Sequence, residues 1–212
     1  MADNYLDKKM EEYRARPMQK KSLRSGATLS RLLLKNRSVR GYDPSFEVRA
    51  DQMRSILEVA TRVPSAMNRQ GLRFRAVLAD EAEKVLPGFH LGGGLPELGL
   101  PTPGTEPRAF IIVCAAVEPD NYLYIDLGIT AQSMLLRATE LGLNGIMIGS
   151  FDKERLQRAF GLPSRPLLLI ALGKGAEQIE LVDIAADESH AYYRREGVHY
   201  VPKVRLDDLL LK

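Results

Sequence analysis

The sequence predicts an α+β fold, in which a central, mainly antiparallel sheet of four to five strands is surrounded by helices. Two observations lead to this prediction. The chain has 212 residues, of which 45% are hydrophobic, so it can bury one sizeable core but hardly two. Several of its predicted strands lie close together in the second half of the chain, after a mainly helical first half. No internal repeat or low-complexity segment is present, and we expect a single domain over residues 1–212.

The first half of the chain is predicted to be mainly helical. Residues 4–16 are rich in charge and predict an exposed helix within an N-terminal segment over residues 1–21. Four further elements are expected before residue 87: a helix over 22–35, a helix that Asp51 caps and Pro64 ends, a strand over 74–78, and a short helix over 81–86.

Residues 87–107 break this pattern, because they are rich in glycine and proline and have no helical or strand periodicity. Loops of this length in compact domains are usually functional or mobile. We expect the segment either to border a functional site or to be a surface loop without contact to one.

The second half of the chain is predicted to supply the core. The apolar run over 109–117 is a buried strand and contains Cys114, the only cysteine, so no disulfide can form within the chain. Residues 120–141 form a helix that is apolar nearly all round, which predicts a central helix or one packed against a partner subunit. The remaining elements are strands over 144–148, 167–172 and 179–184, a helix from Asp152 to Phe160, and a C-terminal arm over 199–212.

The charge of the chain argues against a nucleic-acid binder. There are 30 Lys and Arg residues against 27 Asp and Glu residues, and they are scattered, whereas binding to a phosphate backbone needs a clustered basic patch. No apolar run approaches the roughly 20 residues of a membrane span, and the first residues are too polar for a signal peptide. The sequence therefore predicts a cytoplasmic protein without membrane or nucleic-acid partners.

Most signatures of catalytic sites are absent from the sequence. Gly142, Gly145 and Gly149 do not have the spacing of a dinucleotide-binding glycine motif. The histidines lie apart, without a carboxylate or thiol at metal-ligand spacing, and no Ser or Cys has the context of a nucleophile elbow. We therefore predict no metal site, and no motif in the sequence marks a catalytic nucleophile.

Two short segments could hold a ligand. In Asn36-Arg37-Ser38-Val39-Arg40, two guanidinium groups flank a hydroxyl, and such a group can bind a phosphate through charge-assisted hydrogen bonds. The alternative is an exposed basic helix end that complements the helix dipole. The segment Pro64-Ser65-Ala66-Met67-Asn68-Arg69-Gln70 also follows a helix, and its alternative is an ordinary helix stop with turn-forming Ser and Asn.

In this order, the two segments resemble the nitroreductase family of FMN enzymes. The resemblance continues in Glu-Leu-Gly-Leu-Asn-Gly-Ile-Met-Ile-Gly over 140–149, which is similar to the family's segment that runs to the flavin. It ends in Pro-Lys-Val-Arg-Leu over 202–206, which resembles the family's basic C-terminal segment. Each match is weak by itself, but four matches in register are specific.

The resemblance implies how the FMN phosphate would be held. Arg37 and Ser38 would lie toward the phosphate and the ribityl chain, and Arg40 would approach the pyrimidine edge of the ring. Lys203 and Arg205 would bind the phosphate. The phosphate is a dianion and needs several fixed cations, which fits these residue types.

The resemblance also implies which residues surround the flavin ring. They form two sets: Pro64, Ser65, Ala66, Asn68 and Gln70 from the partner subunit, and Met147, Ile148 and Gly149 from the same chain. A backbone N–H near Gly149 would contact flavin N5. Two positions depart from the family's pattern: Asn36 replaces a common Arg and brings no charge, and Gly71 replaces a common Pro.

The implied protein is a homodimeric FMN-dependent oxidoreductase with a nitroreductase-like fold, whose C-terminal arm extends onto the partner subunit. It would pass electrons from NAD(P)H to a small electron-poor acceptor, such as a nitroaromatic, a quinone or a flavin, by a ping-pong mechanism. The flavin would carry the chemistry. Two alternatives are a specialised flavin enzyme on the same scaffold, for reductive dehalogenation or dehydrogenation, and a non-catalytic flavin-binding protein.

Overall fold

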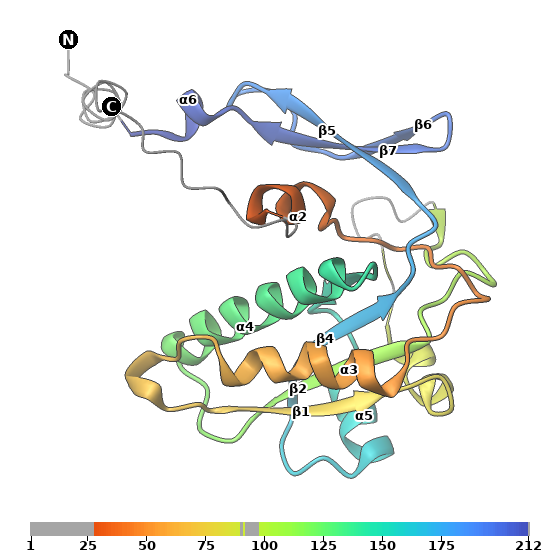
Figure 1. Ribbon diagram of the computed structural model, residues 1–212, viewed down its shortest axis with the longest axis vertical. Helices are drawn as coiled ribbons and strands as arrows, with labels where there is room; N and C mark the ends of the chain where they lie inside the picture. Colours follow the sequence, from red (N-terminus) through yellow and green to blue (C-terminus); the bar gives the residue numbers. More distant parts are fainter. Residues whose placement is uncertain (1–27, 90, 92–97, 212) are drawn as a thin grey trace.

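The centre of the molecule is a four-stranded antiparallel sheet. Figure 1 shows the computed structural model, which describes residues 28–89, 91 and 98–211. The order of the strands is β1-β2-β4-β3. Their bounds are Leu72–Val77 for β1, Ala109–Ala115 for β2, Asn144–Ile148 for β3 and Pro166–Gly173 for β4. The predicted α+β fold with a mainly antiparallel sheet is confirmed.

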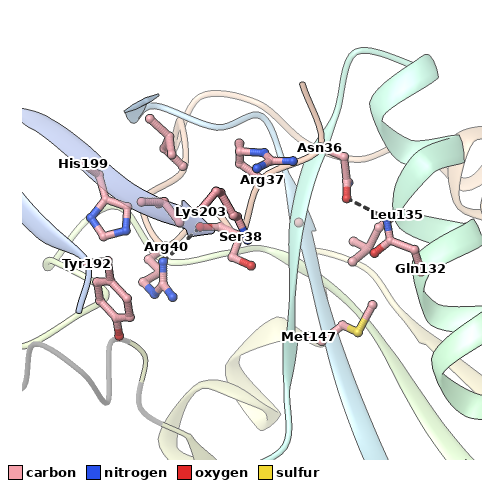
Figure 2. Close-up of a pocket in the computed structure, with 13 residues that line it drawn as sticks. Asn36, Arg37, Ser38, Arg40, Gln132, Leu135, Met147, Tyr192, His199 and Lys203 are labelled. Carbon is pink, nitrogen blue, oxygen red and sulfur yellow. Dashed lines mark hydrogen bonds between the residues drawn. The ribbon is translucent and has the colours of Figure 1, made fainter. Parts of the chain in front are cut away.

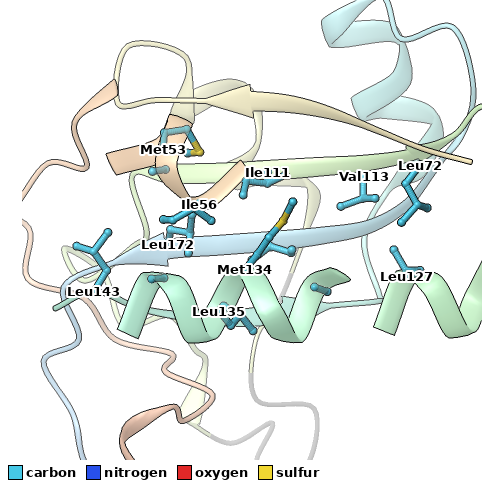
Figure 3. Close-up of a cluster of buried hydrophobic side chains, with 14 of the residues drawn as sticks. Met53, Ile56, Leu72, Ile111, Val113, Leu127, Met134, Leu135, Leu143 and Leu172 are labelled. Atoms are coloured by element: carbon cyan, nitrogen blue, oxygen red, sulfur yellow. The ribbon is translucent and has the colours of Figure 1, made fainter. Parts of the chain in front are cut away.

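Two helices, α3 (Ala50–Leu57) and α4 (Asn121–Glu140), cover one face of this sheet (Figure 1). Buried side chains from both helices and from the strands meet between them, as Figure 3 shows: Met53, Ile56, Ile111, Val113, Met134 and Leu172. Burying one side chain of this size stabilises a fold by roughly 1.5–3 kcal/mol. This cluster therefore fixes α4 against the sheet.

Helix α4 covers nearly the whole predicted range. Asp120 caps it, because its carboxylate accepts a hydrogen bond from the N–H of Leu123 at 2.8 Å. At its N-terminal end, however, Tyr122, Tyr124 and Ile125 are 56%, 53% and 57% exposed. Within a single chain the helix is therefore not buried on all sides.

The opposite face of the sheet carries α5 (Lys153–Phe160) and part of the glycine- and proline-rich segment. Phe89, Leu91 and Leu100 are buried there, and the ring of Phe89 meets that of Phe110 at 5.7 Å. The described part of this segment therefore contributes to the core. In place of the predicted short helix, the chain forms two 3-10 turns, η3 (Ala82–Lys84) and η4 (Leu86–Gly88).

A second, three-stranded sheet lies apart from the first, above helix α2 (Leu29–Lys35) in Figure 1. Its order is β5-β7-β6, with bounds Gln178–Ile184 for β5, Tyr193–Arg195 for β6 and Val198–Val204 for β7. The sequence did not predict β6, which is only three exposed residues long. The predicted C-terminal arm begins as β7, which pairs with β5 and β6 of its own chain. The arm is therefore part of the second sheet at its start, and α6 (Leu206–Leu209) follows it; its extension onto a partner subunit stays a prediction.

Helix α3 begins at a different residue from the predicted cap, Asp51. Arg49, not Asp51, is the N-cap, and its N–H donates to the side chain of Gln52 at 3.1 Å. A glutamine three positions into a helix can reach back in this way. The carboxylate of Asp51 instead binds the guanidinium of Arg49 at 2.9 Å.

The helix predicted over residues 4–16 lies outside the described residues. Among the helices that the structure does describe, none has the length and the apolar character of a membrane span.

Candidate functional site

A pocket of about 300 Å³ lies between α4, β3 and the second sheet (Figure 2). Residues of six parts of the chain line it: Asn36, Arg37, Ser38 and Arg40 after α2; Gln132 and Leu135 on α4; Gly145 and Met147 on β3; Ile179 on β5; Tyr192 just before β6; and His199, Val201 and Lys203 on β7. Several of the residues predicted from the sequence therefore lie at one cavity: Asn36, Arg37, Ser38, Arg40, Met147 and Lys203. Its volume is at the lower end of the roughly 300–1,000 Å³ of ligand sites.

The segment after α2 is fixed in the pocket by backbone and amide hydrogen bonds. Ser38 forms a parallel bridge with Gly145 of β3, and the N–H of Val39 donates to the carbonyl of Gly145 at 3.2 Å. Asn36 donates to Thr139 at 3.0 Å and accepts from Gln132 at 3.1 Å, both on α4. The amide at position 36, where the family commonly has arginine, therefore ties this segment to α4.

The pocket is strongly electropositive. Arg37, Arg40 and Lys203 line it, and no Asp or Glu is among the described lining residues. None of these three cations forms an ion pair within the described part of the chain. Burial lowers the pKa of Arg37, but a guanidinium remains charged in proteins. The pocket is therefore suited to an anion with several negative oxygens.

Unpartnered polar atoms gather at this pocket. Among the described residues, four buried side-chain nitrogens lack a hydrogen-bond partner, and three of them belong to its lining: Nε of Arg37, Nε of Arg40 and Nδ1 of His199. Leaving such a group unpaired costs about 1–3 kcal/mol. Buried polar groups are nearly always satisfied in native proteins, so this concentration marks a cradle for a polar ligand.

The residues at one end of the pocket were not predicted from the sequence. His199 is only 3% exposed, and its ring meets that of Tyr192 at 5.1 Å. Burial lowers the pKa of His199 below its usual 6.5, and the nearby charges of Arg40 and Arg194 lower it further, so the imidazole is neutral at pH 7. His199 and Lys203 point to the same side of β7, so the period of two along this strand was the available signal.

The segment over 64–70 lines a second pocket, of about 390 Å³, rather than the first. Its anchor is Asp126, a buried carboxylate of α4 that accepts hydrogen bonds from Ser65 Oγ at 2.7 Å and from the N–H of Ala66 at 2.9 Å. Met67, Asn68 and Gln70 all have positive φ angles. Such angles are uncommon outside glycine, and three so close together indicate local backbone strain, which is typical of functional sites.

Asp126 was not predicted from the sequence either. The signal was an acid among the apolar residues of the buried face of a helix, since an unpaired carboxylate is almost never buried. The segment over 64–70 has a second tie to the start of α4, because the guanidinium of Arg69 binds the carboxylate of Asp120 with two hydrogen bonds of 2.9 Å. Pro64, Asn68 and Gln70 are exposed in the single chain.

Three other predicted residues lie outside the lining of the first pocket. The side chain of Ile148 is buried on the opposite face of the sheet, because neighbouring residues of a strand alternate in direction. Gly149 is exposed directly after β3. Arg205 is exposed and lies 3.4 Å from the carboxylate of Asp208.

Together, the fold and the pocket define an α+β protein with a site for an anionic ligand that also needs apolar contacts. Leu135 and Met147 lie across the pocket from Arg40 and Lys203 (Figure 2), and Val201 adds a third apolar side chain to the lining. A phosphate carried on a ring system combines these two requirements.

The model of the nitroreductase family matches residues 33–98 and 102–174, which is more than half of the chain. The chain belongs to the nitroreductase family. It is 28% identical over 195 residues to the "Putative NAD(P)H nitroreductase YdgI" of Bacillus subtilis (strain 168), covering 74% of this chain and 88% of the relative.

Solved structures of this family share the fold. A nitroreductase family protein from Streptococcus pneumoniae TIGR4 aligns with a TM-score of 0.63 at 18% identity, over 87% of this chain and 100% of that one. The FMN-dependent nitroreductase NfnB from Mycobacterium smegmatis, solved in complex with NADPH, aligns with a TM-score of 0.57 at 21% identity, over 69% and 87%.

Proposed function

We propose that this chain is an FMN-dependent oxidoreductase that passes electrons from NAD(P)H to a small electron-poor acceptor. The observation that carries the proposal is the set of three unpaired cations and three unpartnered buried nitrogens around one pocket, in a member of the nitroreductase family. An anionic cofactor would satisfy both sets. A relative named as an NAD(P)H nitroreductase and the FMN-dependent NfnB support the choice of donor and cofactor.

The residues of the pocket fit the parts of FMN. We expect Arg37 and Lys203 to bind the phosphate, and Ser38 and Asn36 to donate hydrogen bonds to the phosphate and the ribityl chain. Arg205, next in the same C-terminal segment, would approach the phosphate if its contact with Asp208 opened. Arg40 would face the pyrimidine edge of the ring.

The chain's own residues bind and orient the cofactor, and they tune it. When bound, FMN supplies hydride and electron transfer between NAD(P)H and a nitroaromatic, quinone or flavin, which we expect to follow a ping-pong order. A cation such as Arg40 stabilises the negative charge of a reduced flavin ring. Met147 and Leu135 line the pocket and would keep water from one side of the bound ring. The exposed backbone at Gly149 is where we expect an N–H to meet N5.

We further propose that a homodimer completes the site. The first pocket is small for a flavin nucleotide, and the shaped segment over 64–70 lies in a separate pocket of the same chain. In a symmetric dimer, Pro64, Ser65, Ala66, Asn68 and Gln70 of one chain would lie on the flavin that the other chain holds.

The first test is the purified protein itself. We expect it to bind one FMN per chain, with the visible absorption of a bound flavin, and to oxidise NAD(P)H in the presence of a quinone or a nitroaromatic. Steady-state rates and FMN titration measure these properties. Binding of FMN with turnover no faster than that of free FMN would make the chain a flavin-binding protein without activity. Absence of FMN binding would defeat the proposal.

The second test concerns assembly. Helix α2 has no buried residue, and its Leu29 and Leu34 are 62% and 68% exposed. Tyr122 and Tyr124 at the start of α4 are also more than half exposed. Apolar patches of this kind on a single chain mark an interface. We expect light scattering to give twice the chain mass of 23.7 kDa, and Leu34→Glu to shift the protein toward monomer with loss of FMN. A wild-type monomer that keeps FMN would contradict the shared site.

A further inference from the structure

One end of the pocket is built by residues that follow the family match, which ends at residue 174. Tyr192 lies just before β6 and His199 lies on β7, and both line the pocket beside Arg40 (Figure 2). Glu177 lies just before β5 and accepts a hydrogen bond from the backbone N–H of Arg40. This end of the pocket is therefore made by the three-stranded sheet.

The guanidinium of Arg40 is supported by two aromatic rings in contact with each other. It lies over the ring of Tyr192, at 5.1 Å from the centroid, and it donates a hydrogen bond to the carbonyl of Ser38 at 3.1 Å. The ring of Tyr192 in turn meets that of His199 edge to face, at 5.1 Å and 62°. His199 is almost fully buried, so this support is fixed in the second sheet.

The charges around Arg40 are arranged so that its own charge stays available. Glu177 is the carboxylate of this group, and its side chain forms an ion pair with Arg194 of β6. His199 is neutral at pH 7, because burial and the charges of Arg40 and Arg194 outweigh the opposite effect of Glu177. The guanidinium of Arg40 is thus held by neutral rings, and no ion pair within the described residues cancels its charge.

We propose that Tyr192 and His199 are positioning residues that hold the guanidinium of Arg40 toward the pyrimidine edge of bound FMN. This inference rests on the proposed function. A carboxylate in the place of Tyr192 would also hold the guanidinium of Arg40, but the carboxylate would neutralise its positive charge. An aromatic face holds a guanidinium through a cation–π contact and leaves its charge to act on the ligand. Tyr192 and His199 therefore strengthen FMN binding, and they favour the reduced flavin because its ring is negatively charged.

The test compares variants at neighbouring tyrosines of the same hairpin. Tyr192→Leu keeps an apolar side chain but removes the ring beneath Arg40, whereas Tyr192→Phe keeps the ring. Tyr193→Leu is the matched control, because Tyr193 stacks on Tyr200 and lies outside the pocket lining. For each protein, FMN affinity is measured by fluorescence titration, and the midpoint potential of bound FMN by reductive titration.

We expect Tyr192→Leu to weaken FMN binding by about three- to tenfold and to move the midpoint potential to a more negative value. His199→Leu should change both quantities in the same direction. Tyr192→Phe and Tyr193→Leu should stay close to the wild type in both. Equal behaviour of Tyr192→Leu and Tyr193→Leu would overturn the proposal, as would a Tyr192→Phe variant as impaired as Tyr192→Leu. Failure of the wild-type protein to bind FMN would instead overturn the proposed function.

Discussion

Simultaneous replacement of Arg37 and Lys203 by alanine is expected to weaken FMN binding by about a hundredfold or more. Both cations line the pocket, and neither has an ion pair among the described residues, so both are available to the phosphate. Hydrogen bonds to charged groups contribute roughly 1.5–3 kcal/mol each, so two of them correspond to a factor of about 10² to 10⁴ in affinity. Fluorescence titration of the apoprotein with FMN measures the change.

Two controls isolate the phosphate contact. Lys174→Ala with Arg195→Ala removes the same net charge from exposed positions outside the pocket lining, and we expect FMN affinity to stay within about threefold of the wild type. Riboflavin lacks the phosphate, so its affinity should be nearly equal in the wild type and in the Arg37→Ala/Lys203→Ala variant. An FMN affinity that falls no further than in the control variant would remove Arg37 and Lys203 from the phosphate site.

Gly145→Ala is expected to destabilise the fold by about 1–2 kcal/mol and to disturb the pocket. A Cβ at this position would lie 2.5 Å from the backbone oxygen of Ala171 and 2.7 Å from Leu135 Cδ2. The leucine can move aside, but the carbonyl belongs to the neighbouring strand β4 and cannot. Overpacking of this kind costs roughly 1–3 kcal/mol or more, against about 0.4–1 kcal/mol gained from a less flexible unfolded chain. The carbonyl of Gly145 also holds Val39, so FMN affinity should fall too.

Gly128→Ala is the matched control for this prediction. Gly128 lies in the middle of α4, and a Cβ there meets no other atom within 4 Å. Alanine in a helix is favoured over glycine, so we expect this variant to gain up to about 1 kcal/mol. Urea unfolding of both apoproteins measures the difference. Equal midpoints for the two variants would show that β3 and β4 can separate at Gly145 without cost.

Local patterns in the sequence determined most of the fold around the main sheet. The continuous apolar run of β2 and the long apolar stretch of α4 each indicate an element that is buried on most sides, because few other placements remove so much apolar surface from water. Asp120 and Asp152 indicate where α4 and α5 begin, because the carboxylate of an N-cap residue accepts a hydrogen bond from a backbone N–H that is otherwise unpaired. The predicted cap at Asp51 was wrong, because the side chain of Gln52 reaches back to the backbone N–H of Arg49 and the helix begins there.

The sequence also located the main cations of the candidate site. Arg37, Ser38 and Arg40 are close together in the chain, so a shared role for them could be inferred from their spacing alone. Lys203 was linked to them only through the resemblance to a family, and the fold brings it to the same pocket from far along the chain. The order of such segments is readable in a sequence, but their distances in space are not.

Only the tertiary structure decided how the ends of the pocket are built. Tyr192 and His199 belong to a hairpin that has no distinctive periodicity at β6, and their importance arises from burial beside Arg40, a residue about 150 positions earlier. The division of the predicted segments between two separate pockets is likewise a matter of placement. Burial, unpartnered atoms and electrostatic coupling depend on which residues are neighbours in space, and these neighbours are set by the tertiary fold rather than by any local pattern.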